Sequence, residues 1–412
     1  MIVHGMQTYR RPLVYTLSLP SLFMEPHQPN SNTSSLLRWR SSSVCPAEPI
    51  HVLGVGNVGK LVAHSLARVS PAPPVALLLH RPELLSEWEK AGRCIDVVTD
   101  GSSDKQRSFT TEMISNDKSD ANATSSIIKN LIVTTKTYAT SAAIRPLKHR
   151  LNHESTILFL QNGMGRTIEE VTSELFPNPS TRPHYLAGIT SHGAHKTGPF
   201  SIVHAGHGTT TISAVLLHLD THMANHENSE SIFSIPESSR YLVDQLLSAP
   251  TLAAMAVTPA ELLYVQLEKL IVNAMVNSLT VVFNCLNGQL FNRPSIATLM
   301  QLLLSEAAAV VRALILCSSK GDDEVAILES RFSQPILEQL VRTVAAKTGE
   351  NISSMLQDVR ASRETEVDYI NGYIVARGME LGVDCVHNRT LVQMVKDKRV
   401  ISEFQIPDFF PR

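Results

Sequence analysis

The segment from residue 268 to residue 277 carries the side chains best suited to chemistry in this chain. Lys269, Asn273 and Asn277 follow one another at intervals of four residues, so a helix would present one ammonium group and two amides on a single face. The residues between them are apolar, and an unpaired amide in an apolar core costs about 1–3 kcal/mol. The stripe therefore predicts a polar cavity, where an ammonium group could stabilise developing negative charge and supply a proton. A hydrogen-bond ladder between helices is the alternative.

A glycine-rich turn near the start of the ordered pattern is the second chemical signal. It lies between a short apolar strand and an amphipathic helix, and another strand follows at residues 75–79. Its sequence is Gly54-Val55-Gly56-Asn57-Val58-Gly59. Gly54 would permit the tight turn, Gly56 would let the backbone approach a pyrophosphate, and Gly59 would allow close packing of helix on strand. The helix N-terminus would add amide donors. This context predicts a dinucleotide site, and a glycine turn without a ligand is the alternative.

The end of the second strand indicates which dinucleotide would bind. An acidic residue at this place accepts a hydrogen bond from the ribose 2'-hydroxyl of NAD. Here the strand at 75–79 ends in His80 and Arg81, with no acid. Because a guanidinium group can pair with a 2'-phosphate, Arg81 favours NADPH. The alternative is that Arg81 is a solvated loop charge.

Two further segments place polar side chains where a ligand crevice is expected. Asn162 lies between a predicted strand and Gly163, and loops at strand ends face the crevice in doubly wound sheets. The polar segment 351–358 precedes a predicted helix that contains Glu366. Asn162 could serve only the turn, and Glu366 could be an exposed helix acid.

These candidates are placed by an α/β architecture. Short apolar stretches predict strands at 51–53, 75–79, 131–134 and 156–160, and longer patterns predict helices at 259–283, 295–317, 335–347 and 365–381. The alternation in the first part predicts an N-terminal Rossmann-type doubly wound parallel sheet, followed by an all-helical C-terminal domain. We expect an NADP-binding domain over residues 48–245 and a helical substrate and catalytic domain over 246–412. The polar stretches 102–126 and 220–239 are expected to be surface insertions.

Composition excludes several classes of function. The 412 residues contain 36 Lys and Arg against 38 Asp and Glu, so the chain has no general attraction for nucleic acid or an anionic membrane. No apolar run reaches the roughly 20 residues needed to span a bilayer, and we expect no membrane association. The five cysteines are scattered without metal-ligand or dithiol spacing, which predicts free thiols in a reducing compartment and no metal site.

Residues 1–47 differ from the rest of the chain. They are rich in Ser, Pro and Asn and contain more Arg than acidic residues. We expect an extension without fixed structure, the alternative being a mitochondrial targeting segment. The protein is accordingly expected to be cytoplasmic, with mitochondrial location as the alternative.

Together these segments resemble the ketopantoate reductases, also called 2-dehydropantoate 2-reductases, from residue 50 to about residue 396. The resemblance rests on segments that occur in the family's order: 54–59, 133–136, 161–165, 269–280, and 353–360 with 364–372. In the family, the residue three positions after Lys136 is a cofactor-binding Gln, whereas this chain has Ala139. The resemblance therefore implies no cofactor contact for Ala139, where the family has a contact on the adenosine side.

The resemblance implies roles for individual residues. Lys269 would be the catalytic acid, acting together with Glu366. The implied substrate contacts are Lys269, Asn273, Asn277, Asn287 and Ser354, and the implied cofactor contacts are Gly54, Val55, Gly56, Asn57, Val58, Gly59, Arg81, Lys136, Asn162 and Glu366.

The resemblance also implies a reaction, the NADPH-dependent reduction of 2-dehydropantoate (ketopantoate) to pantoate in pantothenate and coenzyme A biosynthesis. Two alternatives stay open. One is a reductase of the same family that acts on another small branched 2-oxo acid, and the other is a protein that senses NADPH without turnover. A homodimer is compatible with the sequence.

Overall fold

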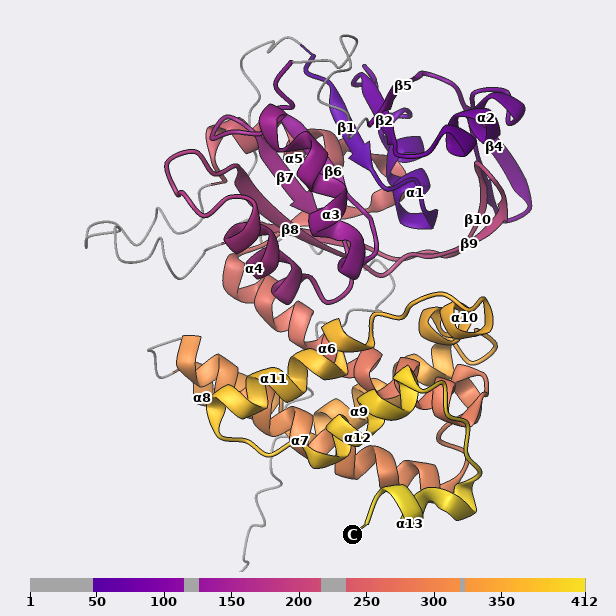
Figure 1. Cartoon of the computed structure of the whole chain (residues 1–412), viewed down its shortest axis with the longest axis vertical. Coiled ribbons are helices and arrows are strands. Elements are labelled where there is room, and N and C mark those ends of the chain that lie inside the picture. Colours follow the sequence, from indigo (N-terminus) through magenta and orange to yellow (C-terminus); the bar gives the residue numbers. More distant parts are fainter. Residues whose placement is uncertain (1–46, 115–125, 216–234, 319–322, 412) are drawn as a thin grey trace, which may run out of the picture. The chain divides into compact units, whose positions relative to one another are not determined.

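The computed structural model describes residues 47–114, 126–215, 235–318 and 323–411 (Figure 1). Residues 1–46 of the expected extension and residues 220–234 of the expected insertion 220–239 lie outside the described residues. Within them, the first part of the chain carries the sheets and the last part is helical (Figure 1).

The main sheet has eight strands in the order β12-β11-β8-β7-β6-β1-β2-β5. Their bounds are β1 Ile50–Leu53, β2 Val75–Leu79, β5 Phe109–Met113, β6 Asn130–Val133, β7 Thr156–Phe159, β8 His184–Thr190, β11 Thr210–Ala214 and β12 Ala254–Ala256. The run from β8 to β5 is parallel throughout, whereas β11 pairs with β8 in the antiparallel sense. The predicted doubly wound parallel sheet is confirmed.

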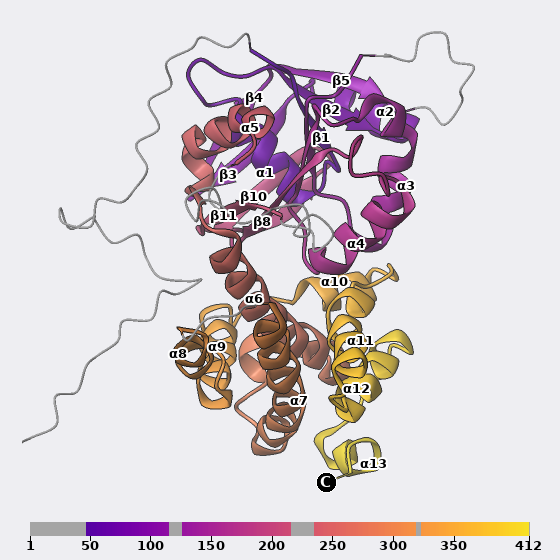
Figure 2. The same ribbon diagram turned by 90° about the vertical axis from the view of Figure 1, so that its left-hand side faces the viewer.

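Side chains alternate between the two faces of this sheet and build one apolar core on each face. In β6, Leu131 and Val133 enter one core while Ile132 enters the other. Helices α1 (Asn57–Leu66) and α5 (Glu237–Ser248) cover the face of Ile132, and α3 (Thr140–Ile144) and α4 (Met164–Glu174) cover the opposite face (Figure 2). Helix α2 (Pro82–Lys90) adds Trp88 to the core on the α1 face. Such runs of apolar residues are expected where both faces of a parallel sheet are buried.

A second sheet of four strands lies against α1 in the order β4-β3-β10-β9. Its strands are β3 Ile95–Thr99, β4 Ser102–Gln106, β9 Gly193–Gly198 and β10 Ser201–Gly206. The prediction of a surface insertion over 102–126 is wrong for β4 and β5, and residues 115–125 lie outside the described part. Strand β4 is an edge strand that is largely exposed, so it lacks the apolar alternation by which a half-buried strand is recognised.

The last part of the chain consists of helices. They are α6 Pro259–Phe283, α7 Pro294–Ser318, α8 Asp323–Arg331, α9 Gln334–Lys347, α10 Ser354–Arg360, α11 Asn371–Leu381, α12 Val386–Lys396 and α13 Ile406–Phe409. The helix predicted at 365–381 begins later than expected, because residues 367–369 form a 3-10 turn and Ile370 has a non-helical backbone. Glu366 therefore precedes the helix. The sheet reaches Ala256 through β12, a strand of three residues beyond the expected domain limit at 245.

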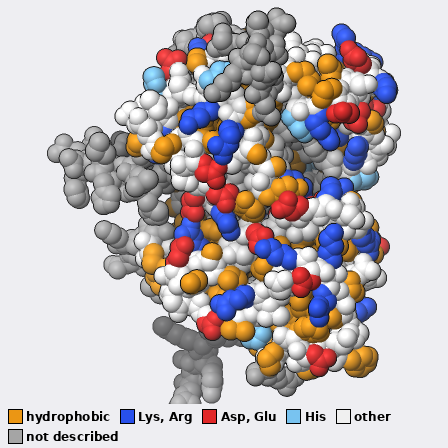
Figure 3. Space-filling model, viewed as in Figure 1, with side chains coloured by type: hydrophobic (Ala, Val, Ile, Leu, Met, Phe, Trp, Pro, Cys, Tyr) orange, Lys and Arg blue, Asp and Glu red, His pale blue; other side chains and the backbone are white. Residues whose placement is uncertain are grey.

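Helix α7 is the one described helix that is long and apolar enough to cross a membrane, over Pro294–Cys317 with a mean hydropathy of 1.8. Half of this stretch is buried inside the protein, where α7 packs against α6, α9, α11 and α12. Core helices often have such a composition, so the feature is weak support for a membrane span. Figure 3 shows basic and acidic side chains interspersed over one face, in keeping with the balanced charge.

Candidate functional site

The glycine turn after β1 has the geometry of a close backbone approach. Gly54 has a φ of +100°, which side-chain-bearing residues rarely adopt. A Cβ atom on Gly59 would lie 2.0 Å from the Gly54 carbonyl oxygen, so the helix can start here only without a side chain. A Cβ atom on Gly56 would meet nothing within 4 Å. The backbone at Gly56 is thus open to a ligand, which fits the dinucleotide site predicted from the sequence.

The remaining residues of this turn anchor it. Val55 and Val58 pack against the core on the α1 face of the sheet. The Asn57 amide donates a hydrogen bond to the Ala194 carbonyl on β9 at 3.1 Å, and Thr134 at the end of β6 donates to the Gly54 carbonyl. The side chains of the turn therefore hold its shape and leave backbone amides for a phosphate.

Arg81 lies where the sequence predicted, directly after β2 and immediately before α2. Its side chain is exposed. Burial, together with the positive charge of Arg81, lowers the pKa of the neighbouring His80. The end of β2 thus carries a histidine and an arginine and no acidic side chain, as the sequence indicated.

Lys136 is held by acidic residues from the helical part of the chain. Its Nζ atom lies 2.7 Å from Oδ2 of Asp358 and 3.7 Å from Oε2 of Glu366. Asp358 is buried and is also paired with Arg363 at 2.9 Å. Burial alone would lower the pKa of Lys136, but Glu366 and Asp358 more than offset it and the pKa is raised. Lys136 therefore stays charged.

Glu366 connects the candidate cofactor residues with one another. One carboxylate oxygen accepts hydrogen bonds from the backbone N–H and the hydroxyl of Thr137, each at 3.3 Å. The other accepts from the Asn162 amide at 3.4 Å. The structure thus brings together Lys136, Asn162 and Glu366, as the resemblance implied.

Lys269 lies on α6 with its ammonium group 2.8 Å from the carbonyl oxygen of Thr190, at the end of β8. Burial lowers its pKa from 10.5 to about 8, and the negative charge of Glu366 acts in the opposite direction. The group is therefore protonated at neutral pH yet titrates close to it, a combination typical of general acids.

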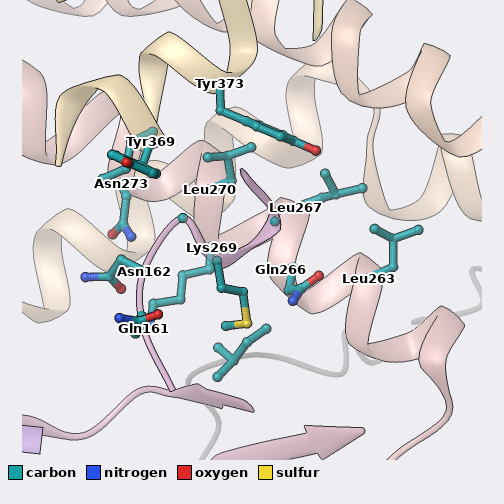
Figure 4. A pocket seen from close by; sticks show the side chains of 15 residues that line it. Gln161, Asn162, Leu263, Gln266, Leu267, Lys269, Leu270, Asn273, Tyr369 and Tyr373 are labelled. Carbon is teal, nitrogen blue, oxygen red and sulfur yellow. The ribbon is translucent and has the colours of Figure 1, made fainter. Parts of the chain in front are cut away.

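A cavity of about 70 Å³ adjoins Lys269 (Figure 4). It is lined by Gln161, Asn162, Gly163, Met164, Gly165, Ile189, Leu263, Gln266, Leu267, Lys269, Leu270, Asn273, Tyr369, Ile370 and Tyr373. Gln161, Asn162 and Asn273 lie at one end of it in Figure 4, and Leu263 and Leu267 lie at the other. The cavity thus has a polar end and an apolar end, with Lys269 beside them.

Three of the implied substrate contacts do not line this cavity. Asn277 is buried one helical turn beyond Asn273. The amide of Asn287 donates to the Thr348 hydroxyl at 3.0 Å. Ser354 is exposed at the first position of α10. Their roles toward substrate stay predictions.

Sequence reasoning gave no role to several residues that the structure places at the site. Asp358 lies in a quoted family segment, but its pairing with Lys136 joins residues far apart in the chain. Gln266 and Tyr369 have no local signal, because each occupies an ordinary position of a helix or turn. Only their contribution to the cavity reveals them.

Family models and curated proteins match most of this chain. Residues 50–216 match the family Ketopantoate reductase PanE/ApbA, and residues 261–399 match the family Ketopantoate reductase PanE/ApbA C terminal. A 2-dehydropantoate 2-reductase of Shigella flexneri is 34% identical over 357 residues, which cover 86% of this chain and 96% of that protein. The Ketoisovalerate reductase BEA2 of Gibberella fujikuroi is 28% identical over 376 residues, and the match covers 82% of this chain and 81% of that protein.

A solved structure shares the fold. D-mandelate dehydrogenase with NADH and anilino(oxo)acetate aligns with a TM-score of 0.65 at 19% identity, covering 85% of this chain and 98% of that one. The two matched family segments together cover most of this chain. With the Shigella flexneri protein similar over nearly its whole length, we conclude that this chain belongs to the ketopantoate reductase family.

Proposed function

We propose that this protein reduces 2-dehydropantoate to pantoate with NADPH. The observation that carries the proposal is the position of Lys269, a protonated lysine with a pKa of about 8 beside a cavity that has polar and apolar ends. Several relatives, among them the Shigella flexneri protein, are 2-dehydropantoate 2-reductases.

The residues at the site suit the reduction of a ketone. A bound nicotinamide cofactor would supply hydride to the carbonyl carbon. As negative charge develops on the carbonyl oxygen, the ammonium group of Lys269 would stabilise it and then donate the proton. Glu366 raises the pKa of Lys269 against the effect of burial, which keeps the acid in its protonated form.

NADPH is the proposed cofactor because the end of β2 carries Arg81 and no acid. A guanidinium group at this place can pair with the 2'-phosphate. Arg81→Ala should therefore raise the KM for NADPH much more than the KM for NADH. Equal changes for both cofactors would rule out this role for Arg81.

A second candidate substrate is 2-oxoisovalerate. The Gibberella fujikuroi relative is a ketoisovalerate reductase, and the apolar end of the cavity could accept a hydrocarbon side chain. The acids differ by a single hydroxymethyl group, so both fit the same reaction at Lys269.

The test is oxidation of NADPH by the purified protein, followed by its absorbance, with 2-dehydropantoate, 2-oxoisovalerate and pyruvate in parallel. We expect the highest kcat/KM with 2-dehydropantoate, and Lys269→Ala should abolish turnover while NADPH still binds. Faster turnover with 2-oxoisovalerate would establish the second candidate. Tight NADPH binding without turnover of any acid would instead favour a sensor of NADPH.

A further inference from the structure

We propose that His192, hydrogen-bonded to His204, is a positioning residue that fixes Lys269 and the glycine turn at the same time. It acts through the segment from Thr190 to Ala194, which contacts both. The inference rests on the proposed function, since it assumes that Lys269 donates a proton while a dinucleotide is bound. It goes further in assigning a role to two histidines that do not line the cavity.

The segment 190–194 reaches from one functional contact to the other. At its start, the carbonyl oxygen of Thr190 accepts a hydrogen bond from the Lys269 ammonium group at 2.8 Å. At its end, the carbonyl oxygen of Ala194 accepts from the Asn57 amide of the glycine turn at 3.1 Å. Four residue steps span at most about 14 Å. A shift of the backbone between these two points would therefore move both contacts.

The ring of His192 ties this segment to three other parts of the chain. Its Nε2 atom lies 3.0 Å from the carbonyl oxygen of Leu252, in the 3-10 turn that precedes β12 and α6. Its Nδ1 atom lies 3.1 Å from Nε2 of His204 on β10 and 3.0 Å from the backbone nitrogen of Gly208. The ring thus lies where the chain leaves β8, forms the β9–β10 hairpin beside α1 and returns to β11 (Figure 1).

The partners fix the direction of each hydrogen bond in this arrangement. A carbonyl oxygen only accepts and a backbone N–H only donates, so Nε2 of His192 carries a hydrogen and Nδ1 is an acceptor. Nε2 of His204 must then donate to Nδ1 of His192. Only a neutral His192 ring can make all three bonds, because a proton on Nδ1 would face two donors.

The surroundings keep both rings neutral at pH 7. Burial is the largest cause that lowers the pKa of His204 to about 4, and the neighbouring His192 and His207 act in the same direction. The Gly206 backbone and the carboxylate of Asp100, which lies 3.5 Å from His207, offset them only in part. Burial likewise lowers the pKa of His192. The hydrogen bonds of the pair therefore persist under the conditions of the reaction.

Loss of the His192 ring should disturb the two contacts in separately measurable ways. The Thr190 carbonyl stabilises the ammonium form of Lys269, so its displacement would lower the pKa of Lys269. Displacement of the Ala194 carbonyl would release Asn57 and leave the glycine turn less preorganised for a dinucleotide. Partial unfolding, by contrast, lowers the activity at every pH and changes neither the pKa nor the affinity of the folded remainder.

The experiment measures two values in wild type and His192→Leu: the pH profile of kcat/KM for 2-dehydropantoate and the Kd of NADPH by fluorescence titration. The alkaline limb of the profile reports the pKa of the acid before the 2-oxo acid binds. We expect this limb to lie about 0.7 pH unit lower in His192→Leu, the effect of losing one hydrogen bond. The Kd of NADPH should rise about fivefold for the same reason.

Three further variants complete the test. His195→Leu makes the same change at an exposed position of β9 and should leave both values unchanged. His204→Leu removes the donor to His192 and should shift both values in the same direction as His192→Leu. His204→Gln supplies an amide nitrogen in place of the ring donor, so it should bring both values back toward those of wild type. The two His204 variants also decide the question if His192→Leu does not fold.

The outcomes separate this inference from the proposed function. If wild type reduces 2-dehydropantoate and the leucine variants at His192 and His204 change neither value, or only one of them, the joint positioning role is refuted and the reductase activity stands. If wild type reduces no 2-oxo acid, the proposed function fails and the inference fails with it. A lower alkaline limb together with weaker NADPH binding, both recovered in His204→Gln, supports the inference.

Discussion

Replacing Lys269 by methionine should make the protein more resistant to unfolding at neutral pH, although it removes the proposed proton donor. Burial lowers the pKa of Lys269 from 10.5 to about 8. The folded protein therefore binds this proton more weakly than the unfolded chain does, and protonation of Lys269 favours unfolding. A neutral side chain of similar length avoids this cost.

The magnitude follows from the size of the pKa change. One pKa unit corresponds to about 1.4 kcal/mol, so a fall from 10.5 to about 8 costs about 3.5 kcal/mol below pH 8. The variant also loses the hydrogen bond to the Thr190 carbonyl, which contributes about 1 kcal/mol. The net gain for Lys269→Met at pH 7 is thus about 2.5 kcal/mol, or about 5–10 °C in Tm for a unit of 150–250 residues. As the pH rises from 8 toward 10.5, Lys269 of the wild-type protein loses its proton. The cost of burying its charge then disappears, and with it the greater stability of the variant.

Thermal unfolding of both proteins at pH 7 and pH 9.5 measures this effect. Lys90→Met is the control, since Lys90 is exposed in the last turn of α2 and should show no such dependence on pH. A Lys269→Met protein that is less stable than wild type at pH 7, or whose advantage is the same at both pH values, would refute the electrostatic argument.

Three further predictions concern the same site. The rate of reduction should fall as pH rises above about 8, because Lys269 must be protonated to act; a flat kcat/KM profile up to pH 10 would contradict this. Gly59→Ala should abolish NADPH binding, measured by fluorescence titration, because its Cβ would lie 2.0 Å from the Gly54 carbonyl oxygen; unchanged affinity would show that the turn can adjust. Asp358→Asn should lower the free energy of unfolding by about 1 kcal/mol. The expected loss is this small because Lys136, the ion-pair partner of Asp358, is partly exposed and solvent screens the pair. Denaturant titration tests this, and an unchanged midpoint would mean that the pair adds no stability.

The sequence by itself determined the elements whose pattern is local. The strand, glycine turn and helix at residues 50–66 are recognisable because glycine spacing and apolar periodicity reflect the backbone of the same few residues. Helix α6 has the bounds predicted, Pro259–Phe283, since its 25 residues form one long helical pattern. The positions of Lys269 and Asn273 on one face follow from that helix.

Other features were decided by the tertiary structure. Strand β4 carries no apolar alternation, because an exposed edge strand pairs through its backbone whatever its side chains are. Glu366 precedes a 3-10 turn where a helix was predicted, and its carboxylate is fixed by Thr137, far away in the sequence. Neither the backbone pairing of β4 nor the contact between Glu366 and Thr137 produces a periodic pattern in the sequence.

The lining of the cavity shows the same division most clearly. Lys269 is recognisable from its spacing with two asparagines, but Gln266 looks like any polar residue of an amphipathic helix. Gln266 lines the cavity only because α6 packs beside segments distant in the chain, among them residues 161–165 and 369–373. The sequence thus determined the chemistry available on α6. Only the packing of residues distant in the chain decided which of those groups line the cavity.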